Sequence, residues 1–205
     1  MKMMEITLKN LVNVKYQSLK NLALITIDRA EKHNAISLQT LEELNQAVDF
    51  AATDSAIGVI AITGAGGKAF ASGSDLNEVL DRDLKKALEP IIQGLADKLE
   101  RLPKPTIAAI DGICMGGGLE VALGCDLRVA TRHSKFATPE GKLGLIPGGG
   151  ATARLPRLVG RGWGMEMLLM GETIDAERAL QIGLITRLVE ADELISELIR
   201  MAEHL

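Results

Sequence analysis

The sequence predicts an α/β fold, because short β-rich apolar runs alternate along the chain with longer runs whose apolar residues have helical spacing. No repeat, low-complexity tract or linker divides the 205 residues. Glycine is abundant, at 21 residues, and it gathers where predicted strands end. These three observations indicate a layered core with sharp, glycine-rich connections.

The first half of the chain contains four predicted strands and two predicted helices. The strands cover residues 12–16, 22–27, 58–63 and 106–111. Ser37 is expected to cap a helix whose apolar stripe includes Leu41 and Leu44. The second helix covers about 91–102 and ends before Pro103, because a residue that precedes proline disfavours helical backbone.

The second half begins with a glycine triplet, 116–118, and a short helix at 119–123. Strands are predicted at 127–130 and 135–138, and helices at 161–170, 175–182 with Asp175 as cap, and 192–205. The last helix keeps its apolar stripe to the final residue. We therefore expect the chain to end within a helix, as a native C-terminal helix can also do.

Composition excludes several classes of protein. Lys and Arg number 23 and Asp and Glu 27, a net charge of −4, so the basic surface of a nucleic-acid binder is absent. No apolar run approaches the ~20 residues of a membrane span, and the N-terminus lacks the apolar stretch of a signal peptide. Two cysteines and three scattered histidines favour neither a disulfide framework nor a zinc site. These features predict a cytoplasmic protein without a membrane partner.

The glycine clusters do not match the common nucleotide-binding motifs. The segment GAGGKAF (64–70) lacks phosphate-loop spacing, neither later cluster gives GxGxxG in the required context, and no serine lies in GxSxG. What remains is a helix that begins near Gly117 after a strand. Its free backbone N–H groups could form an oxyanion hole. The alternative, a tight turn with close helix–strand packing, fits the triplet equally well.

Two glutamates could supply acid–base chemistry. Glu120 lies within LEVAL (119–123), a short segment that otherwise has the composition of a buried helix. Burial would raise the pKa of its carboxyl towards the range of a working acid or base. Glu140 follows Pro139, before the second glycine cluster, and two carboxyls in different environments can divide these roles. Local capping by Glu120 and solvation of Glu140 remain the alternatives from spacing alone.

Five segments in order resemble the crotonase family, the enoyl-CoA hydratase/isomerase group. They are DRAEKHNAIS (28–37), GKAFASGSDLNE (67–78), PKPTIAAIDGICMGGGLEVALGCDLRVA (103–130), FATPEGKLGLIPGGGATARLPRLVG (136–160) and GETIDAERALQIGLI (171–185). The resemblance covers about 22–189. It implies a crotonase-like ββα spiral core with stacked sheets and surrounding helices. Because members of this family usually continue with a further helical segment, the resemblance also implies a core domain over 1–190 and, at 191–205, the start of a C-terminal helical region that is incomplete.

The resemblance also implies catalytic roles. The backbone N–H groups of Ser74, in ASGSD (71–75), and Gly117 correspond to the oxyanion hole that receives the thioester carbonyl. Glu120 and Glu140 occupy the positions of the two hydratase glutamates. By this resemblance Glu120 is the base toward a water molecule that attacks the β-carbon, and Glu140 donates a proton to the α-carbon.

Further positions match the family's substrate contacts. Gly148 matches a pocket position where dienoyl isomerase relatives carry a carboxylate. Gly141 and Ala151 depart from the family pattern, which has an apolar residue and a glycine there. The coenzyme A contacts implied by the resemblance are Ala71, Ser72, Ser74, His33, Asn34 and Ala35.

The sequence thus predicts an enoyl-CoA hydratase that adds water to the 2,3-double bond of an acyl-CoA thioester. No metal or other cofactor is expected, because coenzyme A belongs to the substrate. The resemblance implies a homotrimer, often doubled to a hexamer. The alternatives are a Δ3,Δ2-enoyl-CoA isomerase, a specialised hydroxyacyl-CoA dehydratase, or a noncatalytic acyl-CoA- or RNA-binding protein on the same scaffold.

Overall fold

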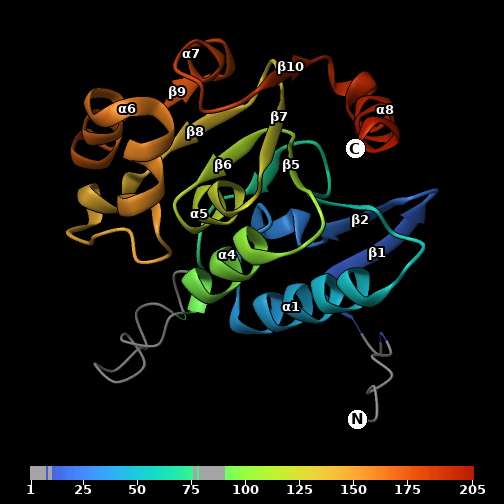
Figure 1. Cartoon of the computed structure of the whole chain (residues 1–205). Coiled ribbons are helices and arrows are strands. Elements are labelled where there is room, and N and C mark those ends of the chain that lie inside the picture. The colour runs from blue at the N-terminus through green and yellow to red at the C-terminus, as the bar shows by residue number, and fades with distance from the viewer. Residues whose placement is uncertain (1–7, 9–10, 76–77, 79–90) are drawn as a thin grey trace.

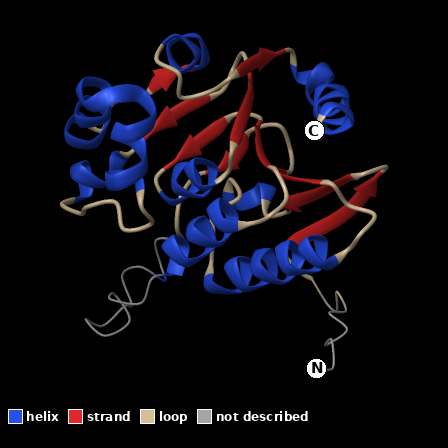
Figure 2. Cartoon of the chain, in the orientation of Figure 1, coloured by secondary structure: helices blue, strands red, loops and turns tan. Residues whose placement is uncertain are grey.

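Two β-sheets form the centre of the computed structural model, and helices surround both of them (Figure 2). The structure describes residues 8, 11–75, 78 and 91–205. The larger sheet has the strand order β1-β2-β3-β5-β7-β10 and the smaller one β4-β6-β8-β9. Strand β1 pairs antiparallel with β2, and β9 pairs antiparallel with β8, whereas every other pairing is parallel.

The strands and helices of the described residues have the following bounds. The larger sheet comprises β1 (Val14–Leu19), β2 (Leu22–Ile27), β3 (Val59–Gly64), β5 (Thr106–Ile110), β7 (Leu127–Thr131) and β10 (Arg187–Val189). The smaller sheet comprises β4 (Ala69–Ala71), β6 (Ile113–Met115), β8 (Lys135–Ala137) and β9 (Ile174–Asp175). The helices are η1 (Ala30–Lys32), α1 (Leu38–Thr53), α4 (Ile91–Arg101), α5 (Gly117–Gly124), η2 (Pro139–Leu143), α6 (Ala151–Met170), α7 (Ala176–Gln181), η3 (Ala191–Glu193) and α8 (Leu194–His204).

The chain alternates between the two sheets as it advances (Figure 1). Strand β3 of the larger sheet leads to β4 of the smaller one and then to α4. The next two strands, β5 and β6, lead to α5, and β7 and β8 follow in the same way. This repetition confirms the predicted ββα spiral with stacked sheets.

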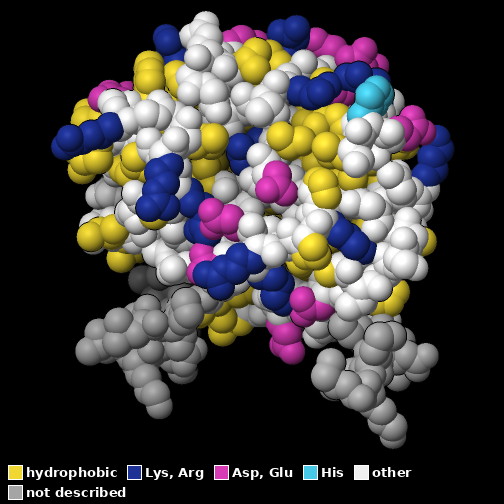
Figure 3. Space-filling view, viewed as in Figure 1, with side chains coloured by type: hydrophobic (Ala, Val, Ile, Leu, Met, Phe, Trp, Pro, Cys, Tyr) yellow, Lys and Arg dark blue, Asp and Glu magenta, His cyan; other side chains and the backbone are white. Residues whose placement is uncertain are grey.

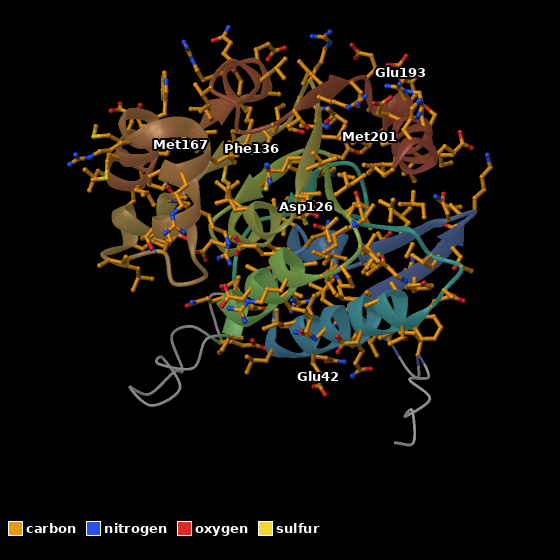
Figure 4. All side chains as sticks on the ribbon, viewed as in Figure 1. Glu42, Asp126, Phe136, Met167, Glu193 and Met201 are labelled. Carbon is orange, nitrogen blue, oxygen red and sulfur yellow. The ribbon has the colours of Figure 1, made fainter. Side chains whose placement is uncertain are left out.

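The period-2 alternation of strand side chains separates two apolar layers. On one face of the larger sheet, side chains such as Ile25, Ile62 and Ile110 pack with α1, α4 and α5. On the other face, Val59 and neighbouring residues pack against α8, whose inner side includes Met201. Figure 4 shows Met201 between α8 and the sheet, and Glu42 pointing away from α1 into solvent. Helices therefore cover both faces of this sheet, as parallel strands require.

Most predicted elements are present within one or two residues of their expected ends. Ser37 caps α1 by accepting a hydrogen bond from Thr40 N, and Asp175 caps α7 in the same way through Arg178 N. Two boundaries were wrong. Strand β1 (Val14–Leu19) ends three residues after the predicted end at 16, and the helix predicted at 161–170 begins ten residues earlier, at Ala151.

The early start of α6 has a local cause. Pro156 and Gly160 lie within it, and Gly160 has a φ of 80°, outside the helical range. Both residue types usually end a helix, so the sequence pattern hides the first half of α6. Within the described ranges, no helix combines the length and apolar character needed to cross a membrane.

Candidate active site

The smaller sheet assembles the predicted site residues along one edge. Strands β4, β6 and β8 are parallel, so their carboxyl ends lie at the same edge of the sheet. Ser74 follows β4, the glycine triplet and Glu120 follow β6, and Glu140 follows β8. Segments distant in sequence are thereby brought together by consecutive turns of the spiral.

The backbones of Ser74 and Gly117 lie against each other. A Cβ on Gly117 would stand 3.4 Å from Ser74 N and 3.1 Å from Ser74 Oγ. Ser74 pairs with Ile36 through its neighbours, since Ile36 N donates to Gly73 O and Asp75 N donates to Ile36 O. Neither Ser74 N nor Gly117 N donates a hydrogen bond to another residue of the described chain. Two adjacent N–H groups are thus available to one oxygen.

Two glycines of the triplet are required by this geometry. Gly116, the N-cap of α5, has a φ of 50° and ψ of −126°, a conformation that residues with a Cβ rarely adopt. At Gly118 a Cβ would collide with the Ala71 carbonyl oxygen, so glycine lets α5 pack directly on the end of β4. The triplet therefore provides the tight turn and the close helix–strand packing that the sequence analysis gave as the alternative to an oxyanion hole. These coexist with the two free N–H groups.

Glu120 is held in the buried interior by backbone donors. Its side chain lies on α5, and the residue is 3% exposed. Gly149 N donates to Glu120 Oε1 at 2.7 Å, and Ala151 N donates to the same oxygen at 3.1 Å. Both donors belong to the turn that starts α6, whose N-terminus also favours a negative charge. The carboxyl group is consequently fixed in one orientation.

Burial raises the pKa of the Glu120 carboxyl above its ordinary value. The backbone N–H groups of Ala151 and Gly149 oppose this rise, followed by the positive charge of Arg154 and by Gly150 N–H. A carboxyl with a raised pKa is a stronger proton acceptor when ionised than an exposed glutamate, and the nearby donors support that ionised form. That behaviour suits a general base.

The Glu140 side chain lies against Gly116, the first residue of the glycine triplet. A Cβ on Gly116 would lie 3.0 Å from Glu140 Oε1, so this carboxyl contacts the N-terminus of α5. Its Oε2 is buried and accepts no hydrogen bond from the described residues. Burial raises the pKa of Glu140, the negative charge of Glu120 raises it further, and its own backbone N–H lowers it. The protonated form, a potential acid, is favoured as a result.

Several residues around the glutamates were missed in the sequence analysis. Ile92 of α4 would touch a Cβ placed on either Gly117 or Gly149, so its side chain closes this part of the site. Gly149 and Ala151 contribute through N–H groups that no side-chain pattern reveals. The one signal in the sequence was the glycine cluster at 148–150, which directly precedes α6. It could have been interpreted as a helix N-terminus with free backbone N–H groups.

The predicted coenzyme A contacts form two joined segments. Ser72 N donates to His33 O at 3.1 Å, and both residues are exposed. Asn34, by contrast, is fully buried. Its amide nitrogen donates to Ala65 O and Ala69 O, and its oxygen accepts from Arg29 N. The Asn34 side chain therefore holds this loop in place, and only exposed or backbone groups nearby could meet a ligand.

The positions that depart from the family pattern keep the glutamates in place. Ala151 still presents its N–H to Glu120, because this contact needs only the backbone. Gly141 lies near the carbonyl oxygens of Leu168 and Leu169, where a Cβ would have ordinary contacts of 3.7 Å. Gly148 is exposed, and a Cβ there would meet nothing within 4 Å. Space for a side chain therefore exists at 148.

Comparison with known proteins reveals extensive similarity. The sequence model described as enoyl-CoA hydratase/isomerase matches residues 17–205. A short-chain-enoyl-CoA hydratase of Clostridium acetobutylicum is 37% identical over 186 residues, covering 90% of this chain and 71% of that protein. A crotonyl-CoA hydratase of Syntrophomonas wolfei is also 37% identical, covering 93% of this chain and 74% of that protein.

Solved structures agree with this similarity. The crystal structure of an enoyl-CoA hydratase from Bacillus anthracis superposes with a TM-score of 0.90 at 35% identity, covering 94% of this chain and 76% of that one. The structure of DspI from Pseudomonas aeruginosa has a TM-score of 0.90 at 36% identity, with coverages of 96% and 75%.

Proposed function

Because the chain belongs to the enoyl-CoA hydratase/isomerase family, we propose that it hydrates the 2,3-double bond of an enoyl-CoA thioester. The observation that carries this proposal is that a buried glutamate, Glu120, and a partly buried one, Glu140, lie beside two backbone N–H groups that donate to no residue the structure describes. Burial raises the pKa of both Glu120 and Glu140, and Ser74 N and Gly117 N lie side by side at the same sheet edge.

In the proposed reaction the thioester oxygen accepts hydrogen bonds from Ser74 N and Gly117 N. Glu120 removes a proton from a water molecule, and the oxygen of that water bonds to the β-carbon. The electron pair of the double bond moves to the thioester, and the resulting enolate is stabilised by the two N–H groups. Glu140 then gives its proton to the α-carbon, and proton exchange with solvent restores both carboxyls. This sequence needs no cofactor, since coenzyme A enters with the substrate.

The division of roles follows from the surroundings of the two carboxyls. Glu120 has donors on Oε1 that support its ionised form, as a base requires. Glu140 has a buried Oε2 without such a donor among the described residues, and a negatively charged neighbour. It therefore retains its proton to a higher pH than an exposed glutamate, as an acid requires.

Loss of the enoyl-thioester absorbance of crotonyl-CoA tests the proposal. Replacing either glutamate, by Glu120→Gln or Glu140→Gln, should reduce kcat by about 10²- to 10⁴-fold. Glu166→Gln, an exposed glutamate of α6, is the matched control and should leave the rate unchanged. Undiminished hydration by the Glu120→Gln, Glu140→Gln double variant would refute the mechanism. A preference for 3-enoyl over 2-enoyl thioesters would favour the isomerase alternative, and tight RNA binding without turnover the noncatalytic one.

The substrate's coenzyme A portion is proposed to contact the joined segments around His33 and Ser72, with the backbones of Ala35, Ala71 and Ser74. Their shared position beside the oxyanion donors supports this assignment. A cytoplasmic location is also proposed, consistent with the two buried free cysteines.

Self-association as a homotrimer, or a hexamer made of two trimers, completes the proposal. Large apolar side chains are exposed near η2 and along α6, a side of the molecule where Figure 3 shows apolar and basic groups interspersed. They are Leu143, Leu145, Ile146, Leu169 and Met170. Apolar surface of this kind commonly marks a protein interface. Light scattering tests the assembly, and a monomeric mass for the protein would contradict it.

A further inference from the structure

Arg154 is a largely buried cation beside the candidate site. It lies in the first turn of α6, and its side chain is 12% exposed. Its Nη2 binds two carboxylates of α4, Asp97 at 2.5 Å and Glu100 at 2.7 Å. Its Nη1 makes a longer contact of 3.4 Å with Gly149 O. The guanidinium therefore ties together α6, α4 and the turn that precedes α6.

That turn is the one that holds Glu120. The oxygen of Gly149 faces Arg154, while its N–H donates to Glu120. Ala151, the second donor to Glu120, lies three residues before Arg154 on the same helix. A Cβ on Gly150 would collide with Arg154 Nη1, so the guanidinium packs closely on the turn. Arg154 therefore contacts the turn that carries both donors to Glu120.

The charged groups near Glu120 come from three elements. Arg154 approaches from α6 and Glu140 from η2, whereas Asp97 and Glu100 of α4 face Arg154. The Arg154 charge lowers the pKa of Glu120, against the larger effect of burial. The ionised carboxylate is thus supported both by the arginine and by the donors that the arginine holds.

We infer that Arg154 is a positioning residue for Glu120. It fixes the turn at 149–151 against α4, so that two N–H groups keep the Glu120 carboxylate in the orientation of a base. This inference rests on the proposed hydration, in which Glu120 removes the proton from water. Arg154 itself touches neither water nor substrate in this role.

Two measurements on the same variants test the inference. Arg154→Ala should lower kcat for crotonyl-CoA by about 10-fold or more, because small displacements of a catalytic group are costly, and change KM by less than about 3-fold. The acidic limb of its pH–rate profile should move to higher pH. Arg154→Lys retains the charge but lacks the second nitrogen that contacts Gly149 O, so it should keep the original acidic limb with an intermediate kcat. Arg157→Ala removes the same charge from an exposed position on α6. It should alter neither kcat nor the acidic limb of the pH–rate profile.

The second measurement does not depend on turnover. In protein with ¹³C-labelled glutamate side chains, the Glu120 resonance, assigned by its loss in Glu120→Gln, should titrate at higher pH in Arg154→Ala than in the unmodified protein. An unshifted titration and a kcat equal to that of Arg157→Ala would overturn the inference. If Arg154→Ala does not fold, the test uses Arg154→Lys instead. An unaltered kcat in Arg154→Lys would then overturn the inference. Absence of turnover in the unmodified protein would instead refute the proposed function, while the titration would still test the hold on Glu120.

Discussion

Gly149 offers the sharpest test of how Glu120 is positioned, because its Cα faces the carboxyl group. A Cβ at this residue would collide with Glu120 Oε2 and lie 2.8 Å from Glu120 Cδ and 2.7 Å from Ile92 Cγ2. Its backbone is not in the left-handed region, so Gly149→Ala adds volume without imposing backbone strain there. The substitution therefore reduces the space available to the Glu120 carboxyl and to the Ile92 side chain beside it.

The size of the displacement can be worked out from these contacts. Carbon atoms in ordinary contact stand about 3.5 Å apart, so a Cβ at 2.8 Å would push Glu120 Cδ back by about 0.7 Å. Catalytic groups tolerate about 0.5 Å of misplacement, and a 1 Å error can cost 10²-fold. We expect Gly149→Ala to lower kcat by about 10- to 100-fold. Overpacking should also cost about 1–3 kcal/mol of unfolding free energy.

Crotonyl-CoA hydration and urea unfolding measure these two effects. Gly162→Ala is the matched control, since it lies exposed on α6 and its added Cβ would meet nothing within 4 Å. This control should keep the full rate and gain up to about 1 kcal/mol from helix propensity. A Gly149→Ala protein that is as active as Gly162→Ala would refute the placement of Glu120 against this turn.

Three further predictions concern stability. Glu120→Gln should raise the melting temperature near neutral pH, because burial raises the Glu120 pKa and the folded state loses stability as pH rises through that value; calorimetry should show the gain vanish below the ordinary glutamate range. Arg29→Ala, which breaks a buried pair with Asp75, should cost about 3–5 kcal/mol in urea unfolding. Arg132→Ala, at an exposed ion pair, should cause a much smaller loss, because solvent screens the pair, and equal losses would contradict this. Asn34→Ala should cost at least about 2 kcal/mol by the same method, and a large increase in KM without that loss would instead indicate that the side chain binds coenzyme A.

The sequence predicted five of the six strands of the larger sheet, because these have five or six residues each and show a pattern, whereas β10, with three residues, was not predicted. Strand β2 was predicted with its observed bounds, 22–27, and every residue of β3 is buried. The smaller sheet was harder. Strands β4 and β6 have three residues each, so they contain too few positions for an alternation to appear.

The candidate site shows the same division. Glu120 and Glu140 could be named as candidates from their positions in the sequence, but their spacing alone left local capping and solvation open, and the family resemblance assigned their roles. The groups that surround them could not be predicted, because Gly149 and Ala151 contact Glu120 through backbone N–H groups. Ile92 is one apolar residue among many on α4, and only the packing of that helix places it against Gly117.

The hydrogen bonds to Glu120 bear on the handedness of the product. Both N–H groups bind Oε1, so exchanging the two carboxylate oxygens would require both bonds to break. In the proposed reaction Oε2 is therefore always the oxygen that takes the proton from water. With the thioester oxygen fixed at Ser74 N and Gly117 N, that water can reach only one face of the planar double bond. Hydration should consequently give a single enantiomer at the new alcohol carbon.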